Sequence, residues 1–105
     1  MKESELEKIL VAEVKKLGGR AYKWVSPGND GVPDRIVIFP GWVPIFVELK
    51  TDTGKLSALQ QVQINKIRDL GQNVCVVHGI KGVSQFFMAC GFESTRKALD
   101  HKYGL

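Results

Sequence analysis

Two segments decide the fold of this chain: residues 32–39, Val-Pro-Asp-Arg-Ile-Val-Ile-Phe, and residues 43–50, Val-Pro-Ile-Phe-Val-Glu-Leu-Lys. Each contains a run of β-branched and aromatic residues, which predicts strands over residues 35–39 and 43–49. Pro40 and Gly41 end the first strand, and the short spacing predicts an antiparallel hairpin. The start of the first strand then lies beside the end of the second, so we expect Asp34 next to Glu48 and Lys50.

The flanking segments predict helices and two further strands. An amphipathic helix is expected over about 3–18, a short strand over 21–25, a turn over 26–31, a helix over about 57–70, a strand buried on both faces over 73–78 and a helix over 80–90. The first helix has an apolar face, and Ser4 with Glu7 has the spacing of a capping box. The second helix is expected to bury Leu59, Val62, Ile67 and Leu70 on one apolar side, and the third Val83, Phe86, Phe87 and Cys90. The polar tail after Gly91 shows no clear pattern. This order predicts an α/β fold with a central mixed sheet flanked by helices.

Composition and charge set wider limits. The chain has 105 residues, 44% hydrophobic and 25% charged, which fits one domain over residues 1–105. Cys75 and Cys90 lie among apolar residues and are expected to be packed thiols. The net charge of +4 is compatible with a polyanionic partner but not specific to one. No apolar run is long enough to span a membrane, and residues 1–8 lack the apolar segment of a secretory signal. We therefore expect a protein without a membrane partner in the cytoplasm, and whether that is the cytoplasm of a bacterium or of a phage-infected host cell stays open.

The predicted hairpin brings together groups that can carry chemistry. Side chains alternate along a strand, so Glu48 and Lys50 share one side and Leu49 points into the core. Two carboxylates at one sheet edge repel each other, and a divalent cation removes that repulsion. Mg²⁺ takes oxygen ligands, so Asp34, Glu48 and the carbonyl of Leu49 are candidate metal ligands. Lys50 is the candidate catalytic residue that orients or helps to deprotonate the attacking water. The set predicts metal-assisted hydrolysis of a phosphodiester.

The residues Gly31-Val32-Pro33-Asp34-Arg35 and Val47-Glu48-Leu49-Lys50 resemble the PD-(D/E)xK nuclease motif. More narrowly, the chain resembles the stand-alone VRR-NUC domains, the virus-type replication-repair nucleases. The likeness extends from the first helix to His78 and includes Ser26-Pro27-Gly28 and Leu56-Ser57-Ala58-Leu59-Gln60. It implies a restriction-endonuclease-like core, dependence on Mg²⁺ or Mn²⁺, and cleavage of DNA. It also implies selectivity for branched DNA, such as four-way junctions, and action as a homodimer.

The resemblance adds further candidate site residues. Such folds often take an acidic residue from the first helix, and helical projection selects Glu7 as catalytic and metal-binding, with Glu3 and Glu13 as weaker candidates. Gln60 is expected to hydrogen-bond the catalytic lysine or a phosphate, or else to lie on a solvated helix face. Candidates for contact with the DNA backbone are Lys23, Ser26, Asn29 and Arg35. Trp24 and Trp42 are expected in the core or a dimer contact, with stacking on exposed bases as the alternative. His78 is expected to be structural.

Two other readings remain open on the sequence. In the first, the chain is a catalytically silent DNA-binding domain that keeps the nuclease fold, and Asp34, Glu48 and Lys50 form only an ion-pair cluster. The paired carboxylates disfavour this alternative. In the second, the chain is a restriction-type nuclease that reads a duplex sequence, but no obvious segment is available to recognise that sequence. Cleavage in the presence of Mg²⁺ separates the first alternative from an enzyme.

Overall fold

The computed structural model describes residues 1–105 and contains four helices and four strands. In chain order they are α1 (Glu3–Lys16), β1 (Arg20–Lys23), β2 (Arg35–Ile38), β3 (Ile45–Lys50), α2 (Ala58–Asp69), β4 (Asn73–His78), α3 (Gly79–Ala89) and α4 (Glu93–Tyr103). The α/β class and the mixed sheet between helices are confirmed. The strands begin or end within two residues of the expected bounds. No helix combines the length and the apolar character that crossing a membrane requires.

The four strands form one sheet in the order β1-β2-β3-β4. The neighbours β1–β2 and β2–β3 are antiparallel, which confirms the hairpin, whereas β3–β4 is parallel. A parallel pair needs a crossover connection, and α2 supplies it. Both outer strands, β1 and β4, have one edge without a strand partner.

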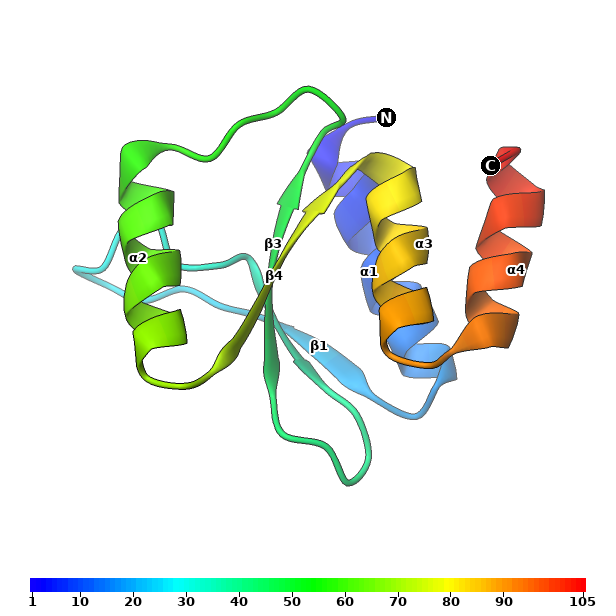
Figure 1. The fold of residues 1–105 in the computed structure, drawn as a ribbon, viewed down its shortest axis with the longest axis horizontal. Helices are drawn as coiled ribbons and strands as arrows, with labels where there is room; N and C mark the ends of the chain where they lie inside the picture. Colours follow the sequence, from blue (N-terminus) through cyan, green and yellow to red (C-terminus); the bar gives the residue numbers. More distant parts are fainter.

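Helices cover the two faces of the sheet unequally. Figure 1 shows α2 alone on one side of the sheet and α1, α3 and α4 on the other. The larger core lies between α1, α3 and the sheet and is centred on Leu10, Val37, Val47 and Phe87. A smaller core lies under α2 and contains Ile64, Ile67 and Val74, with Trp24 and Phe46 packed against it. The face carrying α2 is therefore covered only in part.

The inner face of α2 differs from the one expected. Ile67 is buried as expected, but Leu59, Val62 and Leu70 are 58%, 47% and 77% exposed. Ile64 is the residue that packs with Ile67 against the sheet. The helix begins after Ser57, which forms a capping box with Gln60. The expected apolar face of α2 was wrong because the face that packs on the sheet also carries Gln60, a polar residue that points to the end of β3.

Two other segments differ from the expectation, and β4 agrees with it. Ser4 lies inside α1, whose N-cap is Lys2 without a side-chain cap, so the proposed capping box with Glu7 is absent. β4 is an edge strand whose two faces are both packed, as expected, since Val77 lies in the larger core and Val74 in the smaller one. The tail after Gly91 forms α4, which packs on α3 through the buried Leu99.

Candidate active site

The hairpin between β2 and β3 sets Asp34 beside Glu48. Arg35 pairs with Val47 in the antiparallel register, and the same register continues to Asp34 opposite Glu48. The backbone N–H of Leu49 donates a hydrogen bond to Oδ2 of Asp34 at 2.9 Å. This contact fixes the Asp34 carboxylate at the end of β3, so residues 14 positions apart in the chain meet as the sequence predicted.

Glu48 is a carboxylate buried almost completely, with 1% of the residue exposed. Its Oε2 accepts a hydrogen bond from Nε2 of Gln60 at 3.2 Å and lies 3.5 Å from Nζ of Lys50. Its other oxygen, Oε1, is buried without a hydrogen-bond partner. An unpaired buried carboxylate oxygen is costly, and it is the donor atom that a cation would satisfy.

The surroundings of Glu48 change its acidity. Burial, followed by the nearby charge of Asp34, raises the pKa of Glu48 to about 7, and the positive charge of Lys50 opposes that change. When Glu48 loses its proton, the carboxylates of Glu48 and Asp34 lie close together, with only the ammonium group of Lys50 beside Glu48. Positive charge added at this point would relieve the repulsion.

The third carboxylate at this point comes from Glu3. Oxygen atoms of Glu3, Asp34 and Glu48 all lie within 4.8 Å of one another, a grouping that suits a divalent cation. The unpaired Oε1 of Glu48 supports that fit. Sequence reasoning preferred Glu7 to Glu3, and the structure does not bring Glu7 into this group. Glu3 occupies the first turn of α1, whose N-terminal end reaches the end of β3.

Glu7 instead holds two basic side chains. Its Oε1 lies 2.9 Å from Nζ of Lys23 and 2.8 Å from Nε of Arg35. Burial alone would raise the pKa of Glu7, but the hydrogen bonds and charges of Lys23 and Arg35 lower it overall. Arg35 also donates to the carbonyl of Ala21 at 3.1 Å. Two of the four candidate DNA contacts are therefore ordered by Glu7, on the α1 side of the sheet.

The carbonyl of Leu49 points toward β2, the strand that Asp34 precedes. The Leu49 side chain is buried in the core, and its N–H points to Asp34, so its carbonyl faces the same side of the strand. The register of β2 and β3 continues to Pro33 opposite Leu49. Proline has no N–H, so Pro33 cannot pair with that carbonyl. The sequence analysis did not single out Pro33, although its place before Asp34 was visible.

The loop 26–31 lies beside the start of α2. Asn29 bonds Ser26 twice, through Nδ2 to Oγ and through the backbone, each at 3.0 Å, so neither residue reaches Asp34 or Glu48 by a hydrogen bond. Gly31 has φ +89°, and a Cβ there would lie 2.8 Å from the backbone nitrogen of Gln60. Close approach to α2 therefore requires glycine at this position. The contact sets the loop next to the residue that binds Glu48.

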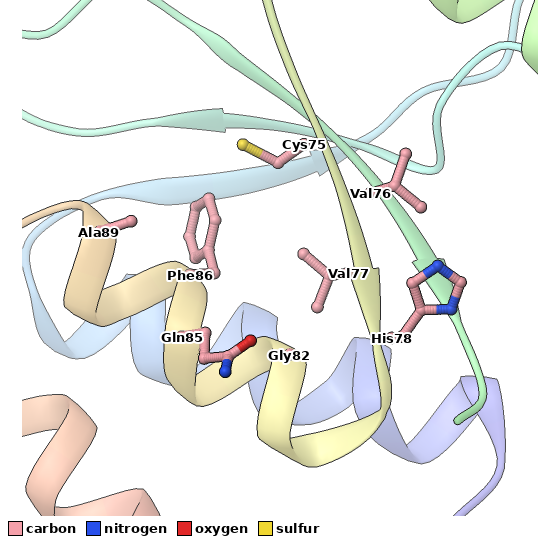
Figure 2. A pocket seen from close by; sticks show the side chains of 8 residues that line it. All are labelled: Cys75, Val76, Val77, His78, Gly82, Gln85, Phe86 and Ala89. Atoms are coloured by element: carbon pink, nitrogen blue, oxygen red, sulfur yellow. The ribbon is translucent and has the colours of Figure 1, made fainter. Parts of the chain in front are cut away.

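A pocket between β4 and α3 lies apart from this cluster. Figure 2 shows its lining, in which Cys75, Val77 and Phe86 are prominent. Burial raises the pKa of Cys75, and that of Cys90 to about 11, so both thiols stay protonated at neutral pH. His78, on the same strand, has Nδ1 3.4 Å from the carbonyl oxygen of Thr51. The pocket contains none of the clustered carboxylates.

Comparisons with known proteins agree with this geometry. No protein-family model matches the chain. A protein named "Putative nuclease p44", from Acyrthosiphon pisum secondary endosymbiont phage 1, is 46% identical over 77 residues, which cover 73% of this chain and 83% of that protein. A solved structure described as a VRR_NUC domain is 32% identical, with a TM-score of 0.77 over 82% of this chain and 94% of that one.

Proposed function

Because the chain belongs to the VRR-NUC family of nucleases, we propose that it is an endonuclease that hydrolyses DNA with a divalent metal ion, Mg²⁺ or Mn²⁺. The observation that carries the proposal is the group of three carboxylates around the buried, unpaired Oε1 of Glu48. A silent DNA-binding domain gains nothing from this arrangement, because the repulsion and the burial of charge both cost stability.

Asp34, Glu48 and Glu3 are the residues that would hold the cation, together with the carbonyl of Leu49. A divalent cation held there supplies positive charge where negative charge develops on the phosphate. The N–H of Leu49 keeps Asp34 in place, and Gln60 and Lys50 keep Oε2 of Glu48 in place, so Oε1 remains free for the cation.

Lys50 is the proposed catalytic residue. Its side chain is 11% exposed and its Nζ lies 3.5 Å from Glu48. From that position the ammonium group can orient the attacking water and offset charge on the phosphate. Gln60 positions Glu48, which is a different role from the direct contact with lysine or phosphate expected from the sequence. Lys23 and Arg35, ordered by Glu7, are proposed to contact phosphates outside the scissile bond, and Ser26 and Asn29 to shape the loop that approaches the DNA backbone.

We further propose that the substrate is branched DNA, such as a four-way junction, and that the enzyme works as a homodimer of single-domain chains. Resemblance to the family supports both points, and a homodimer would supply one carboxylate cluster for each of two strands. The phage origin of the similar protein supports action inside a bacterium or a phage-infected host cell.

A cleavage panel tests the proposal. Four-way junction, flap, nicked and linear duplex DNA, each labelled, are incubated with the wild-type protein in Mg²⁺, Mn²⁺ or EDTA. We expect cuts that require metal and are strongest on the junction. Asp34→Ala should lose both cutting and metal binding, whereas Lys50→Ala should keep metal binding and lose most turnover.

The matched control is Lys97→Ala, which removes an exposed lysine of α4 far from the cluster in the chain. Binding without cutting on every substrate, in either metal, would support the silent DNA-binding domain instead. Equal turnover in Lys50→Ala and the wild type would remove Lys50 from the mechanism.

A further inference from the structure

The part of the sheet that α2 leaves bare carries a second set of exposed side chains. Along β1, Ala21 is buried against the larger core, so its neighbours Arg20 and Tyr22 point to the opposite face. The register pairs Arg20 with Ile38 and Tyr22 with Ile36, which places all four on that face. Tyr22 is 57% exposed and Ile38 is 38% exposed. An exposed tyrosine in the middle of a strand has no role in the core.

Next to these residues the surface forms a pocket of about 320 Å³. The residues that line it come from the turn before β1, from β1 itself and from the turn after β2: Gly18, Gly19, Arg20, Tyr22, Ile38, Phe39, Pro40, Gly41 and Trp42. Trp42 is 44% exposed, although its ring stacks on Phe92 at 5.8 Å and meets the edge of Phe39 at 5.4 Å. The indole is therefore held in place and still accessible. Arg20, Tyr22 and Trp42 are thus all among the residues that line this one hollow.

Strand β1 leads from this pocket to the level of Asp34. The pairing of β1 and β2 extends to Trp24, whose N–H donates to the carbonyl of Asp34 at 3.0 Å. The row Arg20, Tyr22 and Trp24 thus runs along β1 to the level of Asp34. Strand residues advance about 3.4 Å each, so Tyr22 lies about 7 Å before that level and Arg20 about 14 Å. Stacked nucleotides advance by about the same 3.4 Å, so the row spans about four nucleotides.

We propose that this pocket, formed by Arg20, Tyr22, Ile38 and Trp42, binds an unpaired base of the DNA, a few nucleotides from the bond that is cut. The proposal rests on DNA being the substrate. Exposed aromatic rings stack on bases of any sequence, and arginine planes do the same while attracting the phosphates. Lys23, the next residue of β1, points to the opposite face, where it pairs with Glu7, so Arg20 supplies the positive charge of this row. Bases inside a duplex are paired and stacked, so the pocket favours DNA with unpaired bases.

The test measures binding without cutting. Fluorescence anisotropy in EDTA compares a labelled single strand with a blunt duplex of the same length. Loss of one stacking contact costs about 1–3 kcal/mol, so Tyr22→Ala should weaken single-strand binding by about 5-fold or more. Duplex binding should change less than about twofold. Arg20→Ala should follow the same pattern, and Tyr22→Phe should restore binding because the ring is kept.

Leu70→Ala is the matched control, because Leu70 is 77% exposed but lies on α2 away from the pocket. It should leave both affinities unchanged. Melting temperatures and size-exclusion mass are measured for every variant. Unchanged single-strand affinity in Tyr22→Ala, or equal losses on both DNAs, would overturn the proposal. So would a change of oligomeric state in Tyr22→Ala, because a second copy of the chain would then cover this face.

The two proposals fail separately. If the wild type shows this binding pattern but cuts no DNA in Mg²⁺ or Mn²⁺, the base pocket stands and the nuclease mechanism falls. If the wild type cuts DNA while Tyr22→Ala binds and cuts single-stranded and junction DNA normally, the nuclease mechanism stands and the base pocket falls.

Discussion

Glu48 is the residue on which the chemistry of the site depends. The side chain is excluded from water, and Gln60 and Lys50 contact Oε2 while Oε1 has no partner. A core that needed only packing would carry an apolar residue at this place in β3, as it does at Val47 and Leu49. Burying the Glu48 carboxylate next to Asp34 destabilises the folded state, and the binding of a cation would stabilise it.

The raised pKa of Glu48 predicts how the stability of the metal-free protein depends on pH. The ordinary value is 4.5, and burial with the charge of Asp34 raises the folded value to about 7. Between these values the folded state binds more protons than the unfolded state, so the free energy of unfolding falls as the pH rises from about 4.5 to about 7. In Glu48→Gln that contribution disappears. Urea unfolding in EDTA at several values from pH 5 to 8 measures the difference.

The control for this series is Glu5→Gln, which alters an exposed carboxylate of α1. The free energy of unfolding of Glu5→Gln should depend on pH in the same way as that of the wild type from pH 5 to 8. The stability of Glu48→Gln relative to the wild type should increase toward pH 8. A difference that stays constant with pH would show that Glu48 has an ordinary pKa in the folded protein.

Glu3 and Glu7 make a second comparison between single residues. Glu3 lies with Asp34 and Glu48, whereas Glu7 is neutralised by Lys23 and Arg35. We expect Glu3→Gln to weaken Mn²⁺ binding by about tenfold or more, since affinity depends on the number of charged ligands and even the loss of a residue that orients a ligand costs about 10- to 100-fold. Glu7→Gln should leave the Mn²⁺ affinity within about twofold. Isothermal titration measures both, and the opposite order would return Glu7 to the metal site.

At the scale of elements, the sequence predicted the hairpin because its signals are local. Pro40 and Gly41 mark the turn, and continuous β-branched residues mark the strands on either side. Because side chains alternate between the two faces of a strand, the meeting of Asp34 with Glu48 followed from the same local pattern. Neither the choice between Glu3 and Glu7 nor the inner face of α2 is local in this sense. Both depend on where a helix ends relative to the sheet.

Helix α2 shows why its inner face could not be read from hydrophobicity. The residues facing the sheet are Gln60, Ile64 and Ile67, with spacings of four and three that place them on one stripe. Gln60 is polar because it both caps the helix and binds Glu48. The outer stripe has more apolar residues, so a pattern based on apolar residues alone selects it. The helix α4 escaped prediction for a related reason, since Leu99 is its one buried residue.

Substitutions in α2 test this assignment. Ile64 has no exposed surface, so Ile64→Ala should reduce the free energy of unfolding by about 2–5 kcal/mol through lost contacts and a cavity. Leu70→Ala, at a residue 77% exposed, should change it by less than about 0.5 kcal/mol. Chemical unfolding at pH 6 measures both. A larger loss in Leu70→Ala than in Ile64→Ala would mean that the outer stripe is covered in solution.

At the scale of the whole molecule, one chain brings together one group of three carboxylates. That group is formed where the end of β3, the start of β2 and the first turn of α1 meet. If two strands of a junction are cut in one encounter, as we propose, two chains would supply one group for each strand. The proposed homodimer is consistent with this count.

Mixed dimers test the two-chain requirement directly. In light scattering after size exclusion, the wild type should show twice the chain mass of 11.7 kDa. Wild type is then co-refolded with a tagged Lys50→Ala chain, and the mixed species is isolated by the tag. Because each chain would act on its own strand, the mixed dimer should cut a four-way junction in one strand per binding event, leaving a nicked product. The wild-type dimer should leave two cuts, and a dimer in which both chains carry Lys50→Ala should leave none. Two cuts by the mixed dimer, or a wild type that remains at 11.7 kDa when bound to the junction, would show that a single cluster serves both strands in turn.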